Sequence, residues 1–396
     1  MGQPYKVWWW YVIGEPKKEK GLRAWLRKTL GEAPILNTRV NAPVIAEDMQ
    51  AFMENIGYFH TTVTGDTASK GYLVKAIYYA DVHPQYTIQN ITWVNDSSVL
   101  LRQLDSFKRE TILKSGNPYN LNDIEAERSR LDLELKQKGY YFFNPDYIMA
   151  YADSTIGNHK VNLYLNVKKI IPENARHAYT INHISIFPNY TLLNPPPDTS
   201  KEGMLDYDNL WIRDTVHQFK PELFRRVITY RPGKTYSSKD QNTSLNRLIN
   251  LGTFKFVKNI YIVLKDSSDP YRLNSYYYLT PTKKKSLQAE IDGFSKDNSY
   301  IGSQVSVNWK NRNTFGSAEL LTLKVFGSFE LSLADSLKGD DNFSVGGDAS
   351  LTFPKYVIPF FHINESNLYP PKTNLDLGYE LFIKEALYTK YIPFQL

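Results

Sequence analysis

The last third of the chain carries the clearest pattern, a strict alternation of apolar and polar positions that starts at Ser286. Successive side chains of a β-strand point to opposite faces, so a period of two predicts strands with one apolar and one polar face. In the segment from Ser286 to Phe294 the apolar side carries Leu287, Ala289, Ile291 and Gly293. Similar segments follow at 301–309, 321–331, 345–353 and 375–383. Residues 285–396 are therefore predicted to be all-β.

Two architectures fit such strands. Several segments run about nine to twelve residues, close to the length that a tilted strand needs to cross a bilayer. Their polar sides are rich in charge, as a wet interior allows, and the linkers Ser295 to Ser299 and Leu333 to Asn342 are polar. These features favour a membrane β-barrel. A soluble β-sandwich with its apolar face buried is the alternative.

The first two-thirds of the chain repeats one local motif, a helix that ends at a glycine and is followed by an aromatic residue and a strand. The three glycines are Gly57, Gly139 and Gly252. Glycine after a helix favours the left-handed backbone that ends it. The spacings are 82 and 113 residues (139 − 57 and 252 − 139), which is too irregular for a solenoid. The motif predicts tandem α+β modules, with these glycines as structural corners.

Three modules are predicted, each in the order strand, helix, helix, strand, strand. Residues 1–84 form the first, with its elements at Trp8–Ile13, Lys20–Leu30, Ala46–Ile56, Tyr58–Thr64 and Tyr72–Ala80. Residues 85–172 form the second, at Tyr86–Val94, Val99–Phe107, Asn122–Lys138, Asp146–Tyr151 and Lys160–Lys168. Residues 176–280 form the third, at Ala178–Phe187, Pro221–Thr229, Ser238–Leu251, Phe254–Leu264 and Arg272–Leu279. The insertion Tyr190 to Leu210, with Pro195-Pro196-Pro197, is expected to be a surface loop.

Composition excludes several classes of protein. The chain has no cysteine, so disulfide frameworks and thiolate metal sites are excluded. Its net charge of +6 is spread along the sequence without a recognisable nucleic-acid module, so no nucleic-acid partner is expected. The apolar run Val7 to Ile13, with Trp8-Trp9-Trp10, is too short for a membrane helix or a signal peptide.

Nothing in the sequence indicates an enzyme. Four histidines, His159, His177, His183 and His217, are scattered along the chain. The sequence contains no HExxH motif, no GxSxG motif and no phosphate-binding loop. The pair Asp340-Asp341 lacks metal-ligand spacing. We therefore expect no catalytic residue, no metal and no cofactor.

Tandem modules followed by alternating strands resemble the outer-membrane assembly factors of BamA and TamA type, whose periplasmic POTRA repeats precede a membrane barrel. The resemblance is carried by the three glycine corners, by Tyr276–Pro281 leading into Ser286–Glu290, and by Asn311–Glu319, which is similar to a family hairpin. The opening, Ile13–Leu22 and Leu30–Pro34, is similar to the TamA-like lipoprotein members of Bacteroidetes.

This resemblance implies a factor for assembly, insertion or translocation of outer-membrane proteins, with its N-terminal domains in the periplasm. Its partners would be nascent outer-membrane proteins, periplasmic assembly proteins and outer-membrane lipid. Client polypeptides would be held by β-strand augmentation at module edges and at the first barrel strand. That strand carries Leu287, Ala289, Ile291 and Gly293. The alternative function is a soluble periplasmic scaffold that binds proteins and has a β-sandwich C-terminal domain.

The chain departs from the family in three respects. Residues 286–396 have room for about five or six strands, fewer than a family barrel needs, so the barrel is expected to be incomplete and the chain to be C-terminally truncated. The inward-loop motif of Val-Arg-Gly-Phe type and the terminal aromatic signal are absent. The lipid-bearing cysteine is absent too, so lipid anchoring, client identity and oligomeric state stay open.

Overall fold

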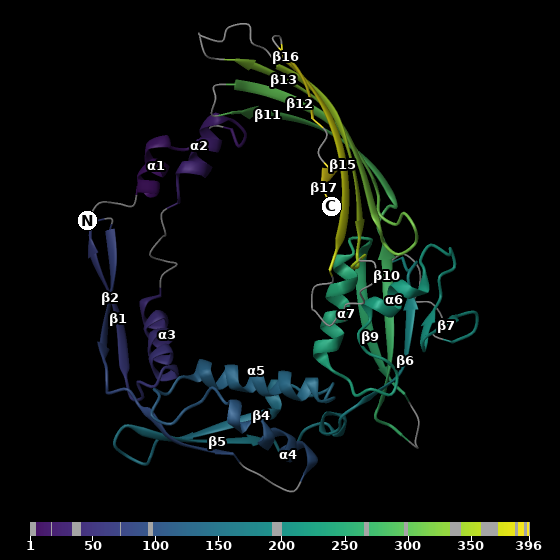
Figure 1. The fold of residues 1–396 in the computed structure, drawn as a ribbon. Helices are drawn as coiled ribbons and strands as arrows, with labels where there is room; N and C mark the ends of the chain where they lie inside the picture. Colours follow the sequence, from purple (N-terminus) through teal and green to yellow (C-terminus); the bar gives the residue numbers. More distant parts are fainter. Residues whose placement is uncertain are drawn as a thin grey trace. The chain divides into compact units, whose positions relative to one another are not determined.

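The computed structural model describes residues 5–16, 18–33, 41–71, 73–93, 98–191, 200–264, 269–296, 300–332, 342–357, 371–384, 387–391 and 394–395 (Figure 1). The chain divides into two compact units, Met1–Arg130 with Ile148–Lys168, and Leu131–Tyr147 with Lys169–Leu396. Each is an α+β unit and is described by itself. Among the described residues, no helix is both long and apolar enough to cross a membrane.

The first unit begins with a helical hairpin instead of the predicted strand Trp8–Ile13. Helix α1 (Tyr5–Ile13) packs against α2 (Leu22–Leu30), with the Arg27 guanidinium 3.8 Å from the ring centre of Trp10. The turn that follows α2 returns to α1, since the Glu32 N–H donates to the Lys6 carbonyl at 3.1 Å. These contacts between the two helices stabilise helical backbone in a stretch that the apolar run alone did not distinguish from a strand.

The rest of the first module is a helix on a two-stranded sheet. Helix α3 (Ala42–Asn55) packs on β1 (Thr62–Lys70) and β2 (Leu73–Asp81), which pair antiparallel. The predicted strand at Tyr58 starts four residues later, at Thr62, because 57–60 form the turn after the helix. Within the described residues this sheet lacks the leading strand that the other two modules have.

The second module has the predicted elements. They are β3 (Thr87–Trp93), α4 (Val99–Ser106), α5 (Leu121–Gln137), β4 (Ile148–Asp153) and β5 (Lys160–Val167), with short 3-10 helices at Lys108–Glu110, Pro145–Tyr147 and Glu173–Arg176. The sheet order is β3-β5-β4, and β3 runs parallel to β5. The Ser98 hydroxyl accepts the Leu101 N–H at 3.3 Å and so caps α4.

The third module contains a larger sheet than predicted. Its elements are β6 (Thr180–Phe187), β7 (Leu205–Tyr207), β8 (Leu210–Ile212), α6 (Pro221–Val227), α7 (Ser238–Asn250), β9 (Phe254–Val263) and β10 (Arg272–Pro281), in the strand order β7-β8-β6-β10-β9. Its core includes the fully buried Ile184, Leu223, Phe224 and Tyr277.

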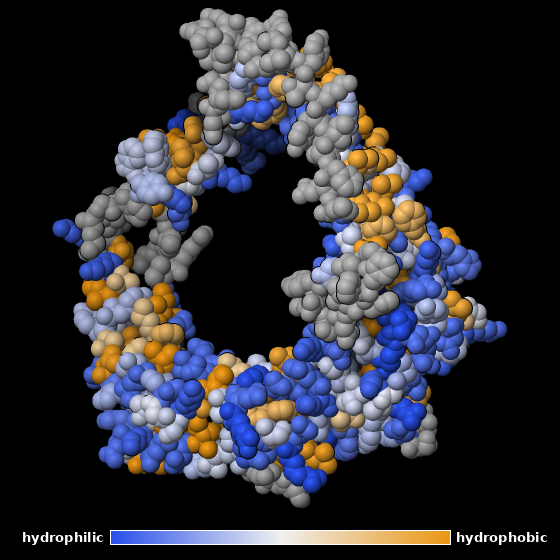
Figure 2. Space-filling model, viewed as in Figure 1, coloured by the Kyte–Doolittle hydropathy of each residue, from blue (hydrophilic) through white to orange (hydrophobic). Residues whose placement is uncertain are grey.

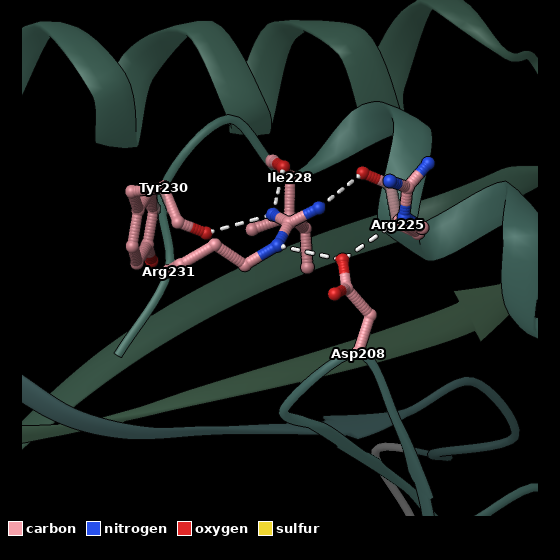
Figure 3. A network of polar contacts seen from close by, with 5 residues as sticks. All are labelled: Asp208, Arg225, Ile228, Tyr230 and Arg231. Carbon is pink, nitrogen blue, oxygen red and sulfur yellow. Dashed lines mark hydrogen bonds and ion pairs between the residues drawn. The ribbon is translucent and has the colours of Figure 1, made fainter. Parts of the chain in front are cut away.

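The insertion in the third module is therefore more than a surface loop. Strand β8 pairs parallel with β6 and covers an edge that would otherwise be open, while residues 192–199, including the three prolines, lie outside the described residues. Asp208, in the turn between β7 and β8, accepts hydrogen bonds from Arg225 at 2.9 Å and Arg231 at 3.2 Å (Figure 3). Arg231 also donates to the carbonyl of Arg225 at 2.8 Å. This network ties the added strands to the end of α6.

The last part of the chain is a seven-stranded antiparallel sheet, as the period-two pattern predicts. It contains β11 (Lys285–Ser295), β12 (Tyr300–Asn311), β13 (Leu320–Ser332), β14 (Asn342–Phe353), β15 (Thr373–Lys384), β16 (Leu387–Tyr391) and β17 (Phe394–Gln395). The order is β11-β12-β13-β14-β15-β16, and β17 also pairs with β15. The sheet is open: among the described strands, β11 has a neighbour on one side only.

Candidate strand-pairing site on the seven-stranded sheet

Strand β11 combines an open backbone edge with exposed apolar side chains. The predicted pairing residues lie along it, with Leu287 opposite Trp309, Ala289 opposite Val307, Ile291 opposite Val305 and Gly293 opposite Ser303. Leu287 is 72% and Ile291 80% exposed. The structure thus places all four on one face of the edge strand. Whether they pair with a client stays a prediction.

The apolar face continues across the sheet from β11. In the register of the strands, Ala289 is followed by Val307, Val325, Gly347 and Tyr379 in one row that crosses five strands. Val325 is 65% exposed in the middle of this row. Figure 2 shows apolar residues gathered along the side where Figure 1 draws this sheet. Other exposed members of the face are Ile301, Val305, Leu323, Phe329, Leu331, Phe343, Val345, Leu375 and Leu377.

The polar face is the more buried of the two. Ser306, Ser328 and Ser344 are almost completely buried, and the hydroxyls of Ser328 and Ser344 lie 2.7 Å apart. Glu330 accepts a hydrogen bond from Lys296 at 2.5 Å. This is the reverse of a soluble sheet, in which the apolar side is buried and the polar side faces water. The strands of this sheet curve along their length (Figure 1).

The hairpin between β12 and β13 fixes the sheet to the third module. The Asn313 amide donates to the carbonyl of Gln218 at 2.7 Å and accepts the Ala318 N–H at 3.0 Å. On the other side of the hairpin, the Lys220 N–H donates to the Gly316 carbonyl at 2.8 Å. Ala318, which is 3% exposed, joins the core of the third module. The sheet edge is thus held on a packed domain.

A buried carboxylate stabilises this hairpin from within. Glu319 is 5% exposed and accepts the N–H groups of Phe315 at 3.1 Å and Ser317 at 3.0 Å. The sequence motif was recognised by its likeness to a family hairpin, but the docking roles of Asn313 and Glu319 were not predicted. The only indication in the sequence is that Asn313 and Glu319, whose side chains can form several hydrogen bonds, both lie in this short connection.

The three glycine corners are the joints between consecutive parts of the chain. In each, an N–H of the following part donates to a corner carbonyl: Tyr86 to Gly57 at 2.8 Å, Tyr179 to Gly139 at 2.9 Å and Thr282 to Thr253 at 2.8 Å. All three glycines have positive φ, of 91°, 104° and 67° in chain order. That these corners serve to join modules stays a prediction.

Aromatic residues reinforce the first two joints in the same way. Phe59 packs on Tyr86 with ring centres 4.9 Å apart, and Tyr141 packs on Tyr236 at 5.0 Å. At these two corners an aromatic residue that follows the glycine thus contacts a residue further along the chain, whereas Phe254 after Gly252 packs on Phe219, with ring centres 5.1 Å apart.

The modules also present open edges and one apolar groove. Strand β4 in the second module and β9 in the third each pair with one strand among those described. In the first module, a groove of about 380 Å³ lies between α3 and the β1–β2 sheet, lined by Ile45, Asp48, Met49, Phe52, Met53, Val63, Tyr78 and Ala80.

The described residues do not assemble a catalytic or metal centre. No group of three or more His, Asp or Glu side chains among them is placed to hold a metal ion. His183 is buried in the sheet of the third module, and burial, then the charge of Lys201, lower its pKa to about 4. The pair Asp340-Asp341 lies outside the described residues.

A buried phenol cluster in the third module is structural. The Tyr230 hydroxyl lies 2.7 Å from those of Tyr261 and Tyr277 and 2.9 Å from that of Ser275. Burial raises the pKa of all three tyrosines, so they remain neutral and satisfy one another inside the core.

No family model matches the chain, and no curated protein matches it. Among solved structures it is similar to the POTRA3-5 fragment of Haemophilus influenzae BamA, with 14% identity and a TM-score of 0.36 over 59% of this chain and 78% of that one. It is also similar to Haemophilus ducreyi BamA lacking POTRA domains 1–3, with 14% identity and a TM-score of 0.40 over 75% of this chain and 51% of that one. A third similar structure is CdiB from Acinetobacter baumannii, with 10% identity and a TM-score of 0.30 over 78% and 56% of the two chains. These are distant likenesses, and the function is argued from the geometry of this chain.

Proposed function

We propose that this protein assembles or inserts outer-membrane proteins, with β11 at the edge of a membrane-embedded sheet as the strand that pairs with a client. The modules before it belong in the periplasm and present further edges to extended polypeptides. The observation that carries the proposal is the exposed apolar face of the seven-stranded sheet together with the open edge of β11. No cofactor and no chemical step is required.

The exposed face supports a lipid environment. Soluble monomers rarely expose a contiguous apolar patch larger than a few hundred Å². Strands β11 to β15 have 11, 12, 13, 12 and 12 residues, enough for a tilted strand to cross the hydrocarbon core. The curved, polar and partly buried inner face fits the wet interior of a partial β-barrel.

The open edge gives the reason to bind a client. An unpaired backbone N–H or carbonyl in hydrocarbon costs several kcal/mol, about the free energy that a hydrogen bond to a new strand returns. A nascent barrel strand has the same unpaired groups, so the two gain by pairing. The docked hairpin at Asn313 and Glu319 holds this edge in place relative to the third module.

The alternative of a soluble scaffold with a β-sandwich requires a second layer over the apolar face. In the described residues the large apolar side chains of that face, such as Ile291 and Val325, are exposed instead. This observation favours the membrane proposal.

Site-specific photocrosslinking tests the pairing edge. The chain is reconstituted in lipid vesicles with a photoreactive phenylalanine at Leu287 or Ile291 and is mixed with a urea-unfolded outer-membrane β-barrel protein. Adducts to the client are expected at both positions. The matched control is Leu323, which lies on the same face and in the same row as Leu287 but in β13, between β12 and β14.

Equal adduct yields at Leu287 and Leu323 would show that the client contacts the face without pairing at the edge. Absence of adducts at both β11 positions, with the sheet in lipid, would overturn β11 as the client strand.

A further inference from the structure

The N-terminal hairpin of α1 and α2 has no buried core, although it is rich in aromatic residues. No residue of either helix is buried. Short helices of nine residues are marginal by themselves and are usually stabilised by packing an apolar face. The hairpin therefore needs an apolar surface that covers it.

In α1 four of the five exposed large apolar residues form one continuous stripe. Tyr5, Trp8, Trp9 and Val12 follow the spacing i, i+3, i+4, i+7, which places them on one side of a helix. Their exposures are 70, 51, 37 and 54%. The half-buried Trp10 faces α2 instead, where it lies under Arg27. One side of α1 is thus used inside the hairpin and another is free.

Helix α2 adds a second exposed apolar stripe and three positive charges, Arg23, Arg27 and Lys28. Leu22, Trp25 and Leu30 are 75, 59 and 40% exposed, at spacings that bring them to one side. Arg23 and Lys28 occupy other positions of the same helix. Figure 2 shows apolar residues where Figure 1 draws these helices.

The chemistry of the hairpin matches a membrane surface. Trp and Tyr have an apolar body and one polar group, so they are favoured at the headgroup level of a bilayer. Among the described residues from 5 to 33 there are six Lys or Arg against three Glu, an excess of three positive charges. Helices with aromatic residues on one side and basic residues on the other lie in the plane of the interface and bind anionic lipid.

We infer that the α1–α2 hairpin is an interfacial membrane-binding element that lies on an anionic lipid surface, with Trp8, Trp9 and Trp25 at the headgroup level. A helix of nine residues is about 14 Å long, so it lies on the membrane and does not span it. This contact is separate from the lipid contact proposed for the seven-stranded sheet.

Spin labelling of the full chain tests the inference. The chain contains no cysteine, so a single introduced cysteine is the only site that takes a nitroxide label. Labels are placed by Trp9→Cys and Trp25→Cys in vesicles of phosphatidylethanolamine with phosphatidylglycerol. Collisions with oxygen, which concentrates in lipid, are compared with collisions with a water-soluble nickel chelate.

Two further labels serve as references in the same vesicles. Ile170→Cys, at a residue that is 94% exposed and lies outside the hairpin, reports water contact. Val325→Cys reports the lipid contact of the seven-stranded sheet, so failure of the proposed function and failure of this inference give different results. Labels at 9 and 25 are expected to show an oxygen-to-nickel collision ratio well above that at 170.

Nickel contact at 9 and 25 equal to that at 170 would overturn the inference. So would a label shielded from both oxygen and nickel, because that result means a protein surface covers the hairpin. Lipid contact that is just as strong in pure phosphatidylcholine would overturn the assignment to anionic lipid.

Charge variants test the electrostatic part. Each cation near an anionic surface strengthens binding by about fivefold, so Lys20→Gln with Lys28→Gln is expected to lower the lipid-to-water ratio of the label at 25 by about 30-fold. The matched control is Lys168→Gln with Lys169→Gln, the same charge change outside the hairpin. An equal effect of both pairs would overturn a local contact with anionic lipid.

Discussion

At the residue scale, the three glycine corners share a conformation but differ in how closely they are packed. A Cβ on Gly139 would lie 2.7 Å from Cγ2 of Thr235, and one on Gly57 would lie 2.8 Å from the carbonyl oxygen of Tyr119. At Gly252 no atom lies within 4 Å of that position. Backbone conformation requires glycine at all three corners, and close packing requires it at two.

Gly252→Val is expected to lower the free energy of unfolding by about 1 to 3 kcal/mol, because a β-branched residue resists a φ of 67°.

Gly139→Ala is expected to lower the free energy of unfolding by about 1 to 3 kcal/mol more than Gly252→Ala does, because it adds overpacking to the same backbone strain. Urea unfolding of the full chain in detergent measures both. Thr235→Ser, which removes the Cγ2 methyl, should recover part of the loss in Gly139→Ala and none in Gly252→Ala. Equal costs at the two glycines would contradict the packing argument.

His183 predicts a pH dependence of stability. In the folded chain its pKa is lowered to about 4, whereas an unfolded histidine has a pKa of about 6.5. The unfolded state therefore takes up a proton first as the pH falls, so stability is full above about pH 6.5 and is lost progressively down to about pH 4. The loss from this residue is at most ~3 kcal/mol.

Melting temperatures of the wild type and His183→Gln between pH 7.5 and pH 4.5 measure this contribution. The variant should lose less stability than the wild type over that range. Identical pH dependence in the two proteins would show that His183 is not the group responsible.

At the element scale, the connection between β12 and β13 does more than turn the chain. Its side chains and backbone reach into the third module at Gln218 and Lys220, and Thr253 donates to the Arg312 carbonyl at 3.1 Å. The neighbouring hairpin therefore helps to position the edge strand β11, whose Ser286 hydroxyl accepts a hydrogen bond from Arg312 at 2.9 Å.

Glu319→Gln is expected to loosen this hairpin by about 2 kcal/mol, because charge-assisted hydrogen bonds to two backbone N–H groups are weakened. Hydrogen exchange at the amides of Phe315, Ser317 and Ala318 measures the local opening. The control is Glu290→Gln, the same chemical change on β11, which should leave these amides protected. Unchanged exchange in Glu319→Gln would mean that other contacts hold the hairpin.

At the scale of the whole molecule, the proposed function places the exposed apolar face of the seven-stranded sheet against membrane lipid. A Lys on the lipid side near the bilayer midplane costs about 2 to 4 kcal/mol, whereas one on the polar side is tolerated. Val325→Lys lies near the middle of β13 and tests the first position, and Gln304→Lys tests the second. Folding in vesicles, followed by gel mobility, should be impaired by the first variant alone. Equal folding of the two would contradict a lipid-facing side.

Features that depend on local periodicity and on backbone chemistry are predictable from the sequence. The period-two segments predicted β11 to β15 within a few residues, and the three glycines predicted helix ends with positive φ. The order of elements in the second module was also predicted, since a long amphipathic helix and its stop signals are local properties. The boundaries of the three modules remain predictions.

Features that depend on contacts between residues far apart in the sequence became known from the tertiary structure. The run Trp8 to Ile13 is helical and packs against α2. Part of the insertion forms strands β7 and β8, because β8 pairs with the edge of β6. The alternation predicted two faces but not which of them is covered. The structure buries part of the polar face, at Ser306, Ser328 and Ser344, while Ile291 and Val325 of the apolar face are exposed. The reason is physical: periodicity specifies which side chains share a face, but curvature and packing partners determine what that face meets.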